Sequence, residues 1–229
     1  HDWHARLDRA RVDMGHTDEE RGRAALAGLV ADDGTPRTWR DRAAEALADD
    51  DLARGRGERA AESYRALAAR TLDEDVARTL EVKALSVDNP PARRAIVDLL
   101  IGEPGRPVDT WLGALAIGQW AEETHEPLAG YLVGKNLALH DQYARAATWL
   151  DRALDAGVPS MRIGRELLRQ RAICACALDD REALAQVRKN VEAPASPFAG
   201  SSGGRRDWVL RLIARCGAGA EPTGPAQNL

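Results

Sequence analysis

Residues 127–160 read PLAGYLVGKNLALHDQYARAATWLDRALDAGVPS, and this stretch decides the fold. Two segments with the apolar spacing of a helix flank the polar sequence HDQ at residues 140–142, which predicts a tight turn. Gly134 before the turn and Ala146 after it are small enough for two antiparallel helices to touch there. The stretch therefore predicts a helical hairpin that is closed by contacts between small residues.

The composition extends this prediction to the whole chain. The 229 residues are 44% apolar and only 4% aromatic, and Ala and Leu outnumber Val, Ile and Thr, the β-branched residues that favour strands. Helical spacing and cap residues recur along the sequence, and no segment alternates as a strand does. The helices expected between residues 92 and 192 cover residues 92–101, 108–124, 127–140, 142–156, 160–178 and 180–192. We therefore expect an all-α fold, an α-solenoid of antiparallel helix pairs with about ten helices.

The hairpin resembles a known repeat family. Large and small residues follow one another in a fixed order and end at a proline: Val133, Gly134, Leu137, Ala146, Leu150, Ala153 and Pro159. This order and spacing are similar to those of the tetratricopeptide repeat (TPR). The resemblance implies a stack of helical hairpins that binds protein partners in a concave groove lined by the first helix of each hairpin.

Two weaker copies of the pattern flank the clear one and bring the resemblance to roughly half of the chain. The copy on the N-terminal side comprises Leu47, Ala48, Gly55, Ala60, Tyr64 and Leu67, and the copy on the C-terminal side comprises Leu167, Cys174, Ala183 and Val187. Asp51 stands where the first of these copies needs a large residue, and Arg171 where the second needs a small one. Residues 72–125 do not keep the repeat.

The groove positions that the resemblance implies on the clear hairpin are Leu128, Tyr131, Lys135, Ala138 and Leu139. Some TPR proteins clamp a terminal carboxylate with Lys and Asn one turn apart, but Tyr131 stands one turn before Lys135 here, so that clamp is not reproduced. The next helix adds a basic stripe at i, i+3 and i+7, which could meet an acidic or extended partner segment. The candidate partner-binding residues are Tyr131, Lys135, Arg162, Arg165 and Arg169.

A second interpretation of the basic stripe is a solvated helix face in which Glu166 is the internal partner of the arginines. The tryptophans on apolar stripes are expected in the core: Trp39, Trp111, Trp120 and Trp149.

Composition changes divide the chain. We expect a TPR-like helical domain over residues 1–192, a flexible linker rich in Ala, Pro, Ser and Gly over 193–206, a short helix over 207–216 and a disordered tail over 217–229. The short helix is expected to dock back through Trp208, Leu212 and Ile213. Because the sequence starts with His, we interpret it as a processed form or a segment of a longer polypeptide.

Several function classes are disfavoured. The 32 basic and 36 acidic residues are interspersed and give a net charge of −4, unlike the clustered basic surface of a nucleic-acid binder. No run of about 20 apolar residues suggests a membrane-spanning helix. The five histidines lack metal-site spacing, the Gly-Ser segment at 200–204 lacks a phosphate-binding ending, and the acidic runs at 49–51 and 179–180 are expected to be solvated or to cap helices. We expect no catalytic residue, cofactor or metal.

Cysteine usage bears weakly on the compartment. Cys174 and Cys176 are two residues apart and point to different sides of a helix, and Cys216 leaves the count odd. We expect all three to be small buried residues, which slightly favours the cytoplasm.

These patterns favour a non-catalytic helical-repeat scaffold that mediates protein–protein interaction, and we interpret the chain as a segment of a larger bacterial protein. The alternative is a regulatory or substrate-presenting domain of an enzyme whose catalytic part lies outside these residues. A third hypothesis, a small-ligand sensor, would require an enclosed apolar cavity with convergent polar groups.

Overall fold

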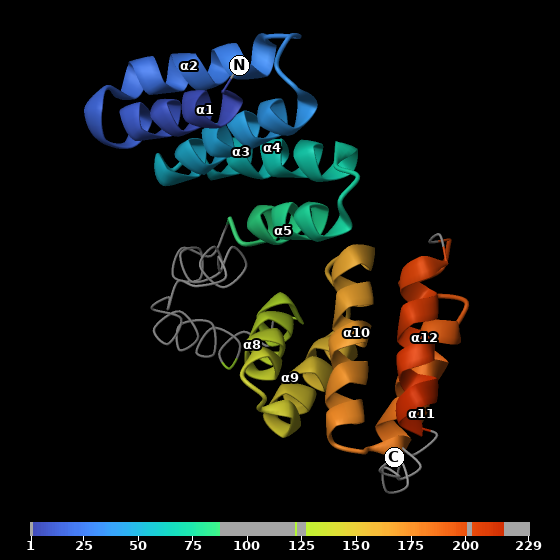
Figure 1. Ribbon diagram of the computed structural model, residues 1–229. Coiled ribbons are helices and arrows are strands. Elements are labelled where there is room, and N and C mark those ends of the chain that lie inside the picture. The colour runs from blue at the N-terminus through green and yellow to red at the C-terminus, as the bar shows by residue number, and fades with distance from the viewer. Residues whose placement is uncertain (1, 88–121, 123–126, 201–202, 218–229) are drawn as a thin grey trace, which may run out of the picture. The chain divides into compact units, whose positions relative to one another are not determined.

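The computed structural model describes residues 2–87, 122, 127–200 and 203–217 (Figure 1). These residues form ten α-helices, one π-helical turn and no strand, which confirms the all-α prediction. The helices are α1 (Trp3–Val12), α2 (Glu19–Ala31), α3 (Arg37–Ala53), α4 (Gly57–Arg70), α5 (Glu74–Leu85), α8 (Pro127–Leu139), α9 (Tyr143–Ala156), α10 (Met161–Ala177), α11 (Arg181–Glu192) and α12 (Gly204–Gly217), and the π-helical turn is η1 (Asp13–Thr17).

The chain divides into two compact units, unit 1 (His1–Ile101) and unit 2 (Gly102–Leu229). The expected domain over residues 1–192 therefore includes parts of both units. The helices expected at 92–101 and 108–124, with Trp111 and Trp120, lie outside the described residues, as does the expected tail from residue 218 onward.

In unit 1 each helix packs against the next one in the sequence. Helices α1 to α3 share an apolar cluster formed by Leu7, Ala10, Leu26, Leu29, Ala43 and Ala46, with Trp39 half-buried against it. Helices α3 to α5 share a second cluster formed by Ala48, Ala60, Ala61, Tyr64, Leu67, Ala68, Leu80, Ala84 and Val87. Alanine is frequent in both clusters, which allows neighbouring helices to approach closely.

Three helical hairpins turn in the same way. Gly55 after α3, Asp141 after α8 and Asp179 after α10 have φ angles of 75°, 58° and 50°. In each turn the amide of the following residue donates to the carbonyl oxygen five residues back, at 2.8, 2.9 and 2.9 Å. A left-handed residue with this hydrogen bond is a Schellman motif, which ends a helix and reverses the chain. The pairs α3–α4, α8–α9 and α10–α11 are therefore equivalent hairpins.

The shared turn fixes the register of the three copies. Seven residues before the left-handed residue stand Ala48, Gly134 and Ala172, and all three are buried. Ala172 therefore occupies the same place relative to its turn as Ala48 and Gly134. Arg171, which the sequence pattern aligns with these small residues, is also buried and pairs with Asp151 of α9 at 2.6 Å.

Helices α8 and α9 touch through small residues, as predicted. A Cβ atom on Gly134 would lie 2.7 Å from the Leu150 side chain and 3.2 Å from the carbonyl oxygen of Ala146. One turn earlier, a Cβ atom on Gly130 would lie 3.2 Å from the Cβ of Ala153. The absence of side chains at the two glycines thus sets the distance between the helices.

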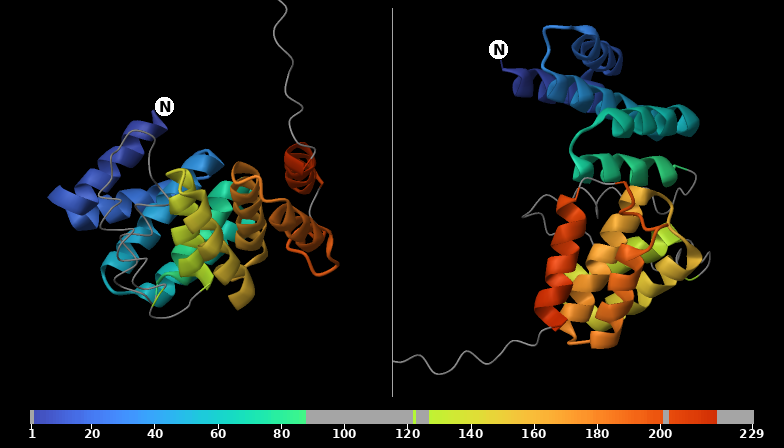
Figure 2. Two further views of the ribbon diagram at one scale, coloured as in Figure 1. Left: turned by 90° about the horizontal axis from the view of Figure 1, so that it is seen from below. Right: turned by 90° about the vertical axis from the view of Figure 1, so that its right-hand side faces the viewer.

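Helices α10, α11 and α12 lie side by side in unit 2 (Figures 1 and 2). They share an apolar cluster that consists of Leu168, Ala172, Ala175, Ala183, Leu184, Val187, Val191, Phe198, Val209 and Ile213. Helices α10 and α12 run in the same direction, because Arg169 lies beside Trp208 and Cys176 lies beside Cys216.

The segment between α11 and α12 contributes to this cluster. Ser196 and Phe198 are buried, and Arg165 of α10 donates to the carbonyl oxygen of Pro197 at 2.9 Å. Residues 196–198 are therefore packed on unit 2, whereas a flexible linker was expected there. The expectation failed because a single aromatic residue among Ala, Pro, Ser and Gly gives no periodic signal.

Candidate partner-binding site

Tyr131 and Lys135 lie on α8, one turn apart. Tyr131 is 0% exposed, and Leu128 and Ala138 on the same side of the helix are also buried. Lys135 is half-buried, with its ammonium nitrogen 5.9 Å from the centre of the Tyr131 ring. Tyr131 is therefore a core residue and is not placed to touch a partner, which corrects the expectation. Leu139, at the end of α8, is exposed.

The three arginines of the predicted basic stripe are half-buried along one side of α10. Arg169 donates to both carboxylate oxygens of Glu166, at 2.8 and 3.0 Å. Glu166 is buried and also accepts a bond of 2.8 Å from Gln170. Glu166 is therefore an internal partner of Arg169, as the second interpretation expected, but it is buried and not solvated.

Trp208 of α12 extends the basic stripe. The guanidinium carbon of Arg169 lies 5.4 Å from the centre of the Trp208 ring, within the range of a cation–π interaction. We expected Trp208 to dock inward, but Val209 and Ile213 are the buried pair and Trp208 is 40% exposed. Apolar spacing alone did not separate Trp208 from Val209, because the two residues are adjacent and each lies one turn from another apolar residue.

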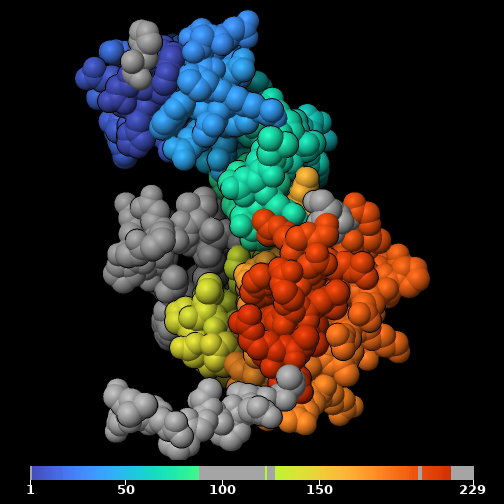
Figure 3. Space-filling view, turned by 45° about the vertical axis from the view of Figure 1, so that its right-hand side comes forward, coloured from blue at the N-terminus to red at the C-terminus, as the bar shows by residue number. Residues whose placement is uncertain are grey.

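Arg205, Arg211 and Arg215 lie on the same side of α12 as Trp208. Their spacing from Trp208 is three residues before it, three after it and seven after it. We call the combined surface the α10–α12 face; its residues are Arg162, Arg165, Arg169, Arg205, Trp208, Arg211 and Arg215. Helices α10 and α12 each carry four arginines and one acidic residue. Figure 3 shows the exposed outer surface of α12 in red. Positive charge is thus concentrated on two neighbouring helices.

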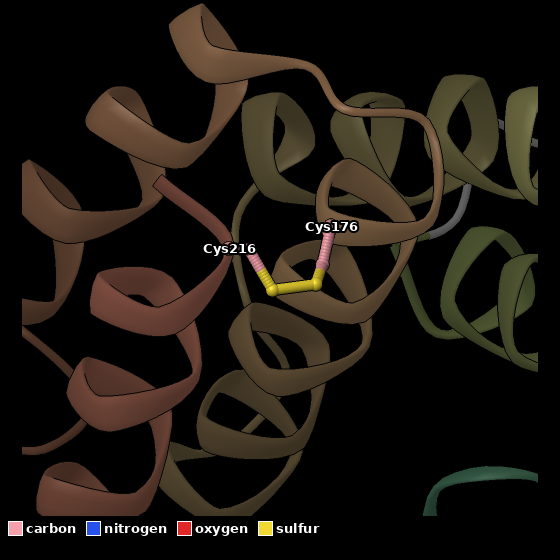
Figure 4. The surroundings of a disulfide bond; sticks show 2 residues. All are labelled: Cys176 and Cys216. Atoms are coloured by element: carbon pink, nitrogen blue, oxygen red, sulfur yellow. A yellow bond between two sulfur atoms is a disulfide. The ribbon is translucent and has the colours of Figure 1, made fainter. Parts of the chain in front are cut away.

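A disulfide joins the two helices of this face. Cys176 of α10 and Cys216 of α12 are bonded, with their Cα atoms 5.4 Å apart and a sequence separation of 40 (Figure 4). Cys174 is free and buried. The expectation of three unbonded cysteines is therefore correct for Cys174 and wrong for the other two, since sequence spacing does not reveal which helices become neighbours.

Unit 1 contains a buried polar cluster that the sequence did not reveal. Lys83 of α5 is 2% exposed, and its ammonium group donates to Glu45 at 2.7 Å and to Asp49 at 2.9 Å. The hydroxyl of Tyr64 donates to the same oxygen of Asp49 at 2.6 Å. The cluster therefore links α3, α4 and α5.

The pKa values of Lys83 and Tyr64 are both held above their ordinary values. Burial alone would lower the pKa of Lys83, but the charges of Asp49 and Glu45 outweigh it and hold the pKa above its ordinary value. Burial, followed by the charge of Asp49, raises the pKa of Tyr64. Lys83 stays charged and Tyr64 stays neutral at neutral pH, so neither is activated as a nucleophile or base.

Asp51, near the end of α3, is a buried acidic residue. It is 3% exposed and pairs with Arg23, Arg56 and Arg59 at 2.7, 2.7 and 3.1 Å. Burial alone would raise the pKa of Asp51, but hydrogen bonds from Arg56 and Arg23 outweigh it and the pKa lies below its ordinary value. The expectation of a solvated acidic run is wrong here, because arginines from α2 and from the start of α4 cover the end of α3. Asp180, in contrast, caps α11 as expected.

Other kinds of site find little support in the described residues. They hold no group of three or more His, Cys, Asp or Glu side chains placed to bind a metal ion, and none of their helices has the length and apolar character to cross a membrane. An open depression of about 460 Å³ lies beside α11, lined by Arg171, Asp180, Glu182, Ala183, Ala185, Gln186 and Lys189. It is open to solvent and five of its seven lining residues have charged or amide side chains, so it differs from an enclosed apolar ligand cavity.

Comparison with known proteins gives no family assignment. No protein-family model matches the chain, and neither a curated protein nor a solved structure is similar enough to count as a match.

Proposed function

We propose that the chain is a non-catalytic helical-repeat scaffold that binds an acidic segment of a protein partner across the α10–α12 face. The observation that carries this proposal is the concentration of six arginines on the α10–α12 face of a chain whose net charge is −4. Guanidinium groups form paired, charge-assisted hydrogen bonds with carboxylates, so an acidic segment matches this surface in chemistry.

The repeated hairpin supports binding on a surface. Within unit 2, α8 contacts α10 and α10 contacts α12, and the hairpins α8–α9 and α10–α11 have equivalent turns. Successive first helices of this kind form an extended surface on which each repeat adds contact area. Such a surface suits an extended peptide better than it suits chemistry on a small molecule.

The aromatic content of the face favours a protein segment over a nucleic acid. Proteins that bind single-stranded nucleic acids without sequence preference stack several bases on aromatic side chains. Trp208 is the single aromatic residue in the α10–α12 face as defined above. The net negative charge of the chain also opposes a polyphosphate partner.

The proposal can be tested by fluorescence anisotropy with defined probes at physiological salt. The probes are a short labelled peptide in which Glu and Asp alternate with Gly and Ser, the same peptide with Lys at the acidic positions, and a labelled single-stranded oligonucleotide. We expect the acidic peptide to bind and the Lys peptide to show no binding. Tighter binding of the oligonucleotide than of the acidic peptide would contradict the proposal.

Charge-reversal variants locate the binding surface. Arg162→Glu with Arg211→Glu changes the α10–α12 face, whereas Arg145→Glu with Arg188→Glu makes the same change in net charge on α9 and α11. The face variant should weaken peptide binding about tenfold, since each exposed ion pair contributes up to about 1 kcal/mol. The control variant should change it much less. Equal losses in both variants would mean that net charge alone attracts the peptide.

A further inference from the structure

Helix α12 is held on unit 2 by a small apolar contact, to which the partly buried Leu210 and Leu212 add, by the contact of Trp208 with Arg169, and by one covalent bond. Of its 14 residues, Val209 and Ile213 are buried. The covalent bond is the disulfide between Cys176 and Cys216. Isolated helices of this length are marginal in water, so the helical state of α12 depends on its attachment to the rest of unit 2.

Charge opposes the attachment of α12 to α10. Each of these helices contributes three arginines to the α10–α12 face, so two positively charged surfaces lie side by side. The fourth arginine of α10, Arg171, pairs with Asp151 of α9. Like charges within about 10 Å repel one another at ordinary ionic strength, and added salt weakens the repulsion. The disulfide therefore holds together two helices that electrostatic repulsion tends to separate.

The bonded cysteines are placed for exchange with an external thiol. Cys176 and Cys216 are each the second-last residue of their helix, and both are half-buried (Figure 4). Cys174 is buried, and burial raises its thiol pKa to about 11. Because the thiolate is the nucleophile in exchange, Cys174 stays inert at neutral pH. Exchange is thus confined to the Cys176–Cys216 pair.

We propose that the Cys176–Cys216 disulfide is a redox clamp that keeps α12 beside α10 and thereby assembles the α10–α12 face. This inference rests on the proposed function, because it states how the same face is regulated. The co-reactant is a dithiol reductant, either a small molecule or a protein. It supplies two electrons and two protons: the protein S–S bond breaks, both cysteines become thiols, and the reductant becomes a disulfide. After reduction, repulsion between the arginines loosens α12 and removes Trp208 from the face.

The clamp is tested by hydrogen–deuterium exchange of the full chain before and after reduction with a dithiol, with complete reduction verified by alkylation and mass spectrometry. We expect the α12 amides to exchange at least about tenfold faster after reduction, because local opening becomes easier. The α8 and α9 amides are the internal control and should not change. High salt should slow α12 exchange in the reduced protein, because it screens the repulsion. Unchanged α12 exchange after full reduction would overturn the clamp.

A cysteine variant tests the clamp without a reductant and so controls for the reductant's other effects. Cys176→Ser with Cys216→Ser should exchange as the reduced protein does and should not respond to dithiol. The acidic peptide is then titrated into the oxidised and reduced proteins. If reduction speeds exchange of the α12 amides but leaves peptide binding unchanged, the disulfide does not control the α10–α12 face. If the oxidised protein fails to bind the peptide while α12 exchange still responds to reduction, the proposed function fails and the clamp stands.

Discussion

The hydroxyl of Tyr64 on α4 donates a 2.6 Å hydrogen bond to Asp49 on α3, in a cluster that also holds the buried Lys83. We expect Tyr64→Phe to lower the free energy of unfolding by about 1–2 kcal/mol, because the fully buried Tyr64 loses its hydrogen bond to a charged, partly exposed carboxylate. Tyr143→Phe is the matched control, since Tyr143 donates a bond of the same length to the exposed Asp141. Urea unfolding measures both; equal effects would show that the buried cluster contributes nothing special.

Close packing of α8 on α9 makes Gly134 sensitive to a single methyl group. Gly134→Ala should lower the free energy of unfolding by about 1–3 kcal/mol, because the new Cβ meets the buried Leu150 and the backbone of Ala146. Gly28→Ala on α2 is the control, because nothing lies within 4 Å of the added Cβ. It should raise stability by up to about 1 kcal/mol through helix propensity. A neutral Gly134→Ala would mean that the hairpin is packed more loosely.

At the left-handed residues of the repeated turn, adding a Cβ atom should lower the stability of the fold and removing one should raise it. Gly55→Ala should destabilise the chain by about 1 kcal/mol, because a Cβ is unfavourable at a φ of 75°. Asp179→Gly should stabilise it by up to about 1 kcal/mol, because it removes a Cβ at a φ of 50°. Thermal unfolding followed by circular dichroism tests both. Two changes of the same sign would contradict the shared turn geometry.

Asp51 predicts a pH dependence with a defined sign. Its pKa in the folded chain lies below the ordinary value of 3.8, so its ionised form stabilises the fold above that pH, and this stabilisation is lost as the pH falls through the folded-state pKa. Asp51→Asn should therefore cost about 1–3 kcal/mol at neutral pH.

The difference between wild type and Asp51→Asn should shrink in acid, which urea unfolding over a pH series measures. Asp33→Asn is the control, because Asp33 is fully exposed and makes a single ion pair with Arg40. A difference that is independent of pH would show that the arginines do not hold the ionised form of Asp51.

Counting the free thiols of the protein tests for the disulfide. The oxidised native protein should show no thiol that reacts quickly at neutral pH, because the pKa of Cys174 is raised to about 11. Unfolding without reductant should expose one thiol, and unfolding with reductant should expose three. Alkylation of the native protein should accelerate as the pH approaches about 11. Three thiols without reductant would exclude the disulfide.

Local signals were sufficient to predict the helices of unit 2. The segments expected at 127–140, 142–156, 160–178 and 180–192 agree within one residue at each end with α8, α9, α10 and α11. Apolar spacing and cap residues act over a few residues, so they can be read from the sequence. The contact of Gly134 with Ala146 was also predictable, because a short turn separates the two helices.

Contacts between distant segments were not predictable in this way. Lys83 meets Glu45 and Asp49 across 38 and 34 residues, and Cys176 meets Cys216 across 40. The arginine stripe of α10 followed from helical spacing. Tertiary packing buries Tyr131 under neighbouring elements and leaves Trp208 exposed. No local sequence pattern encodes this packing.

The bond between Cys176 and Cys216 closes a covalent ring that contains the whole of α11. If the polypeptide is stretched from its ends, tension passes between α10 and α12 through the two sulfur atoms, and the backbone inside the ring bears no load. The oxidised chain therefore has a maximum extension on the order of 130 Å shorter than that of the reduced chain. Single-molecule force spectroscopy would register this difference as a shorter contour length.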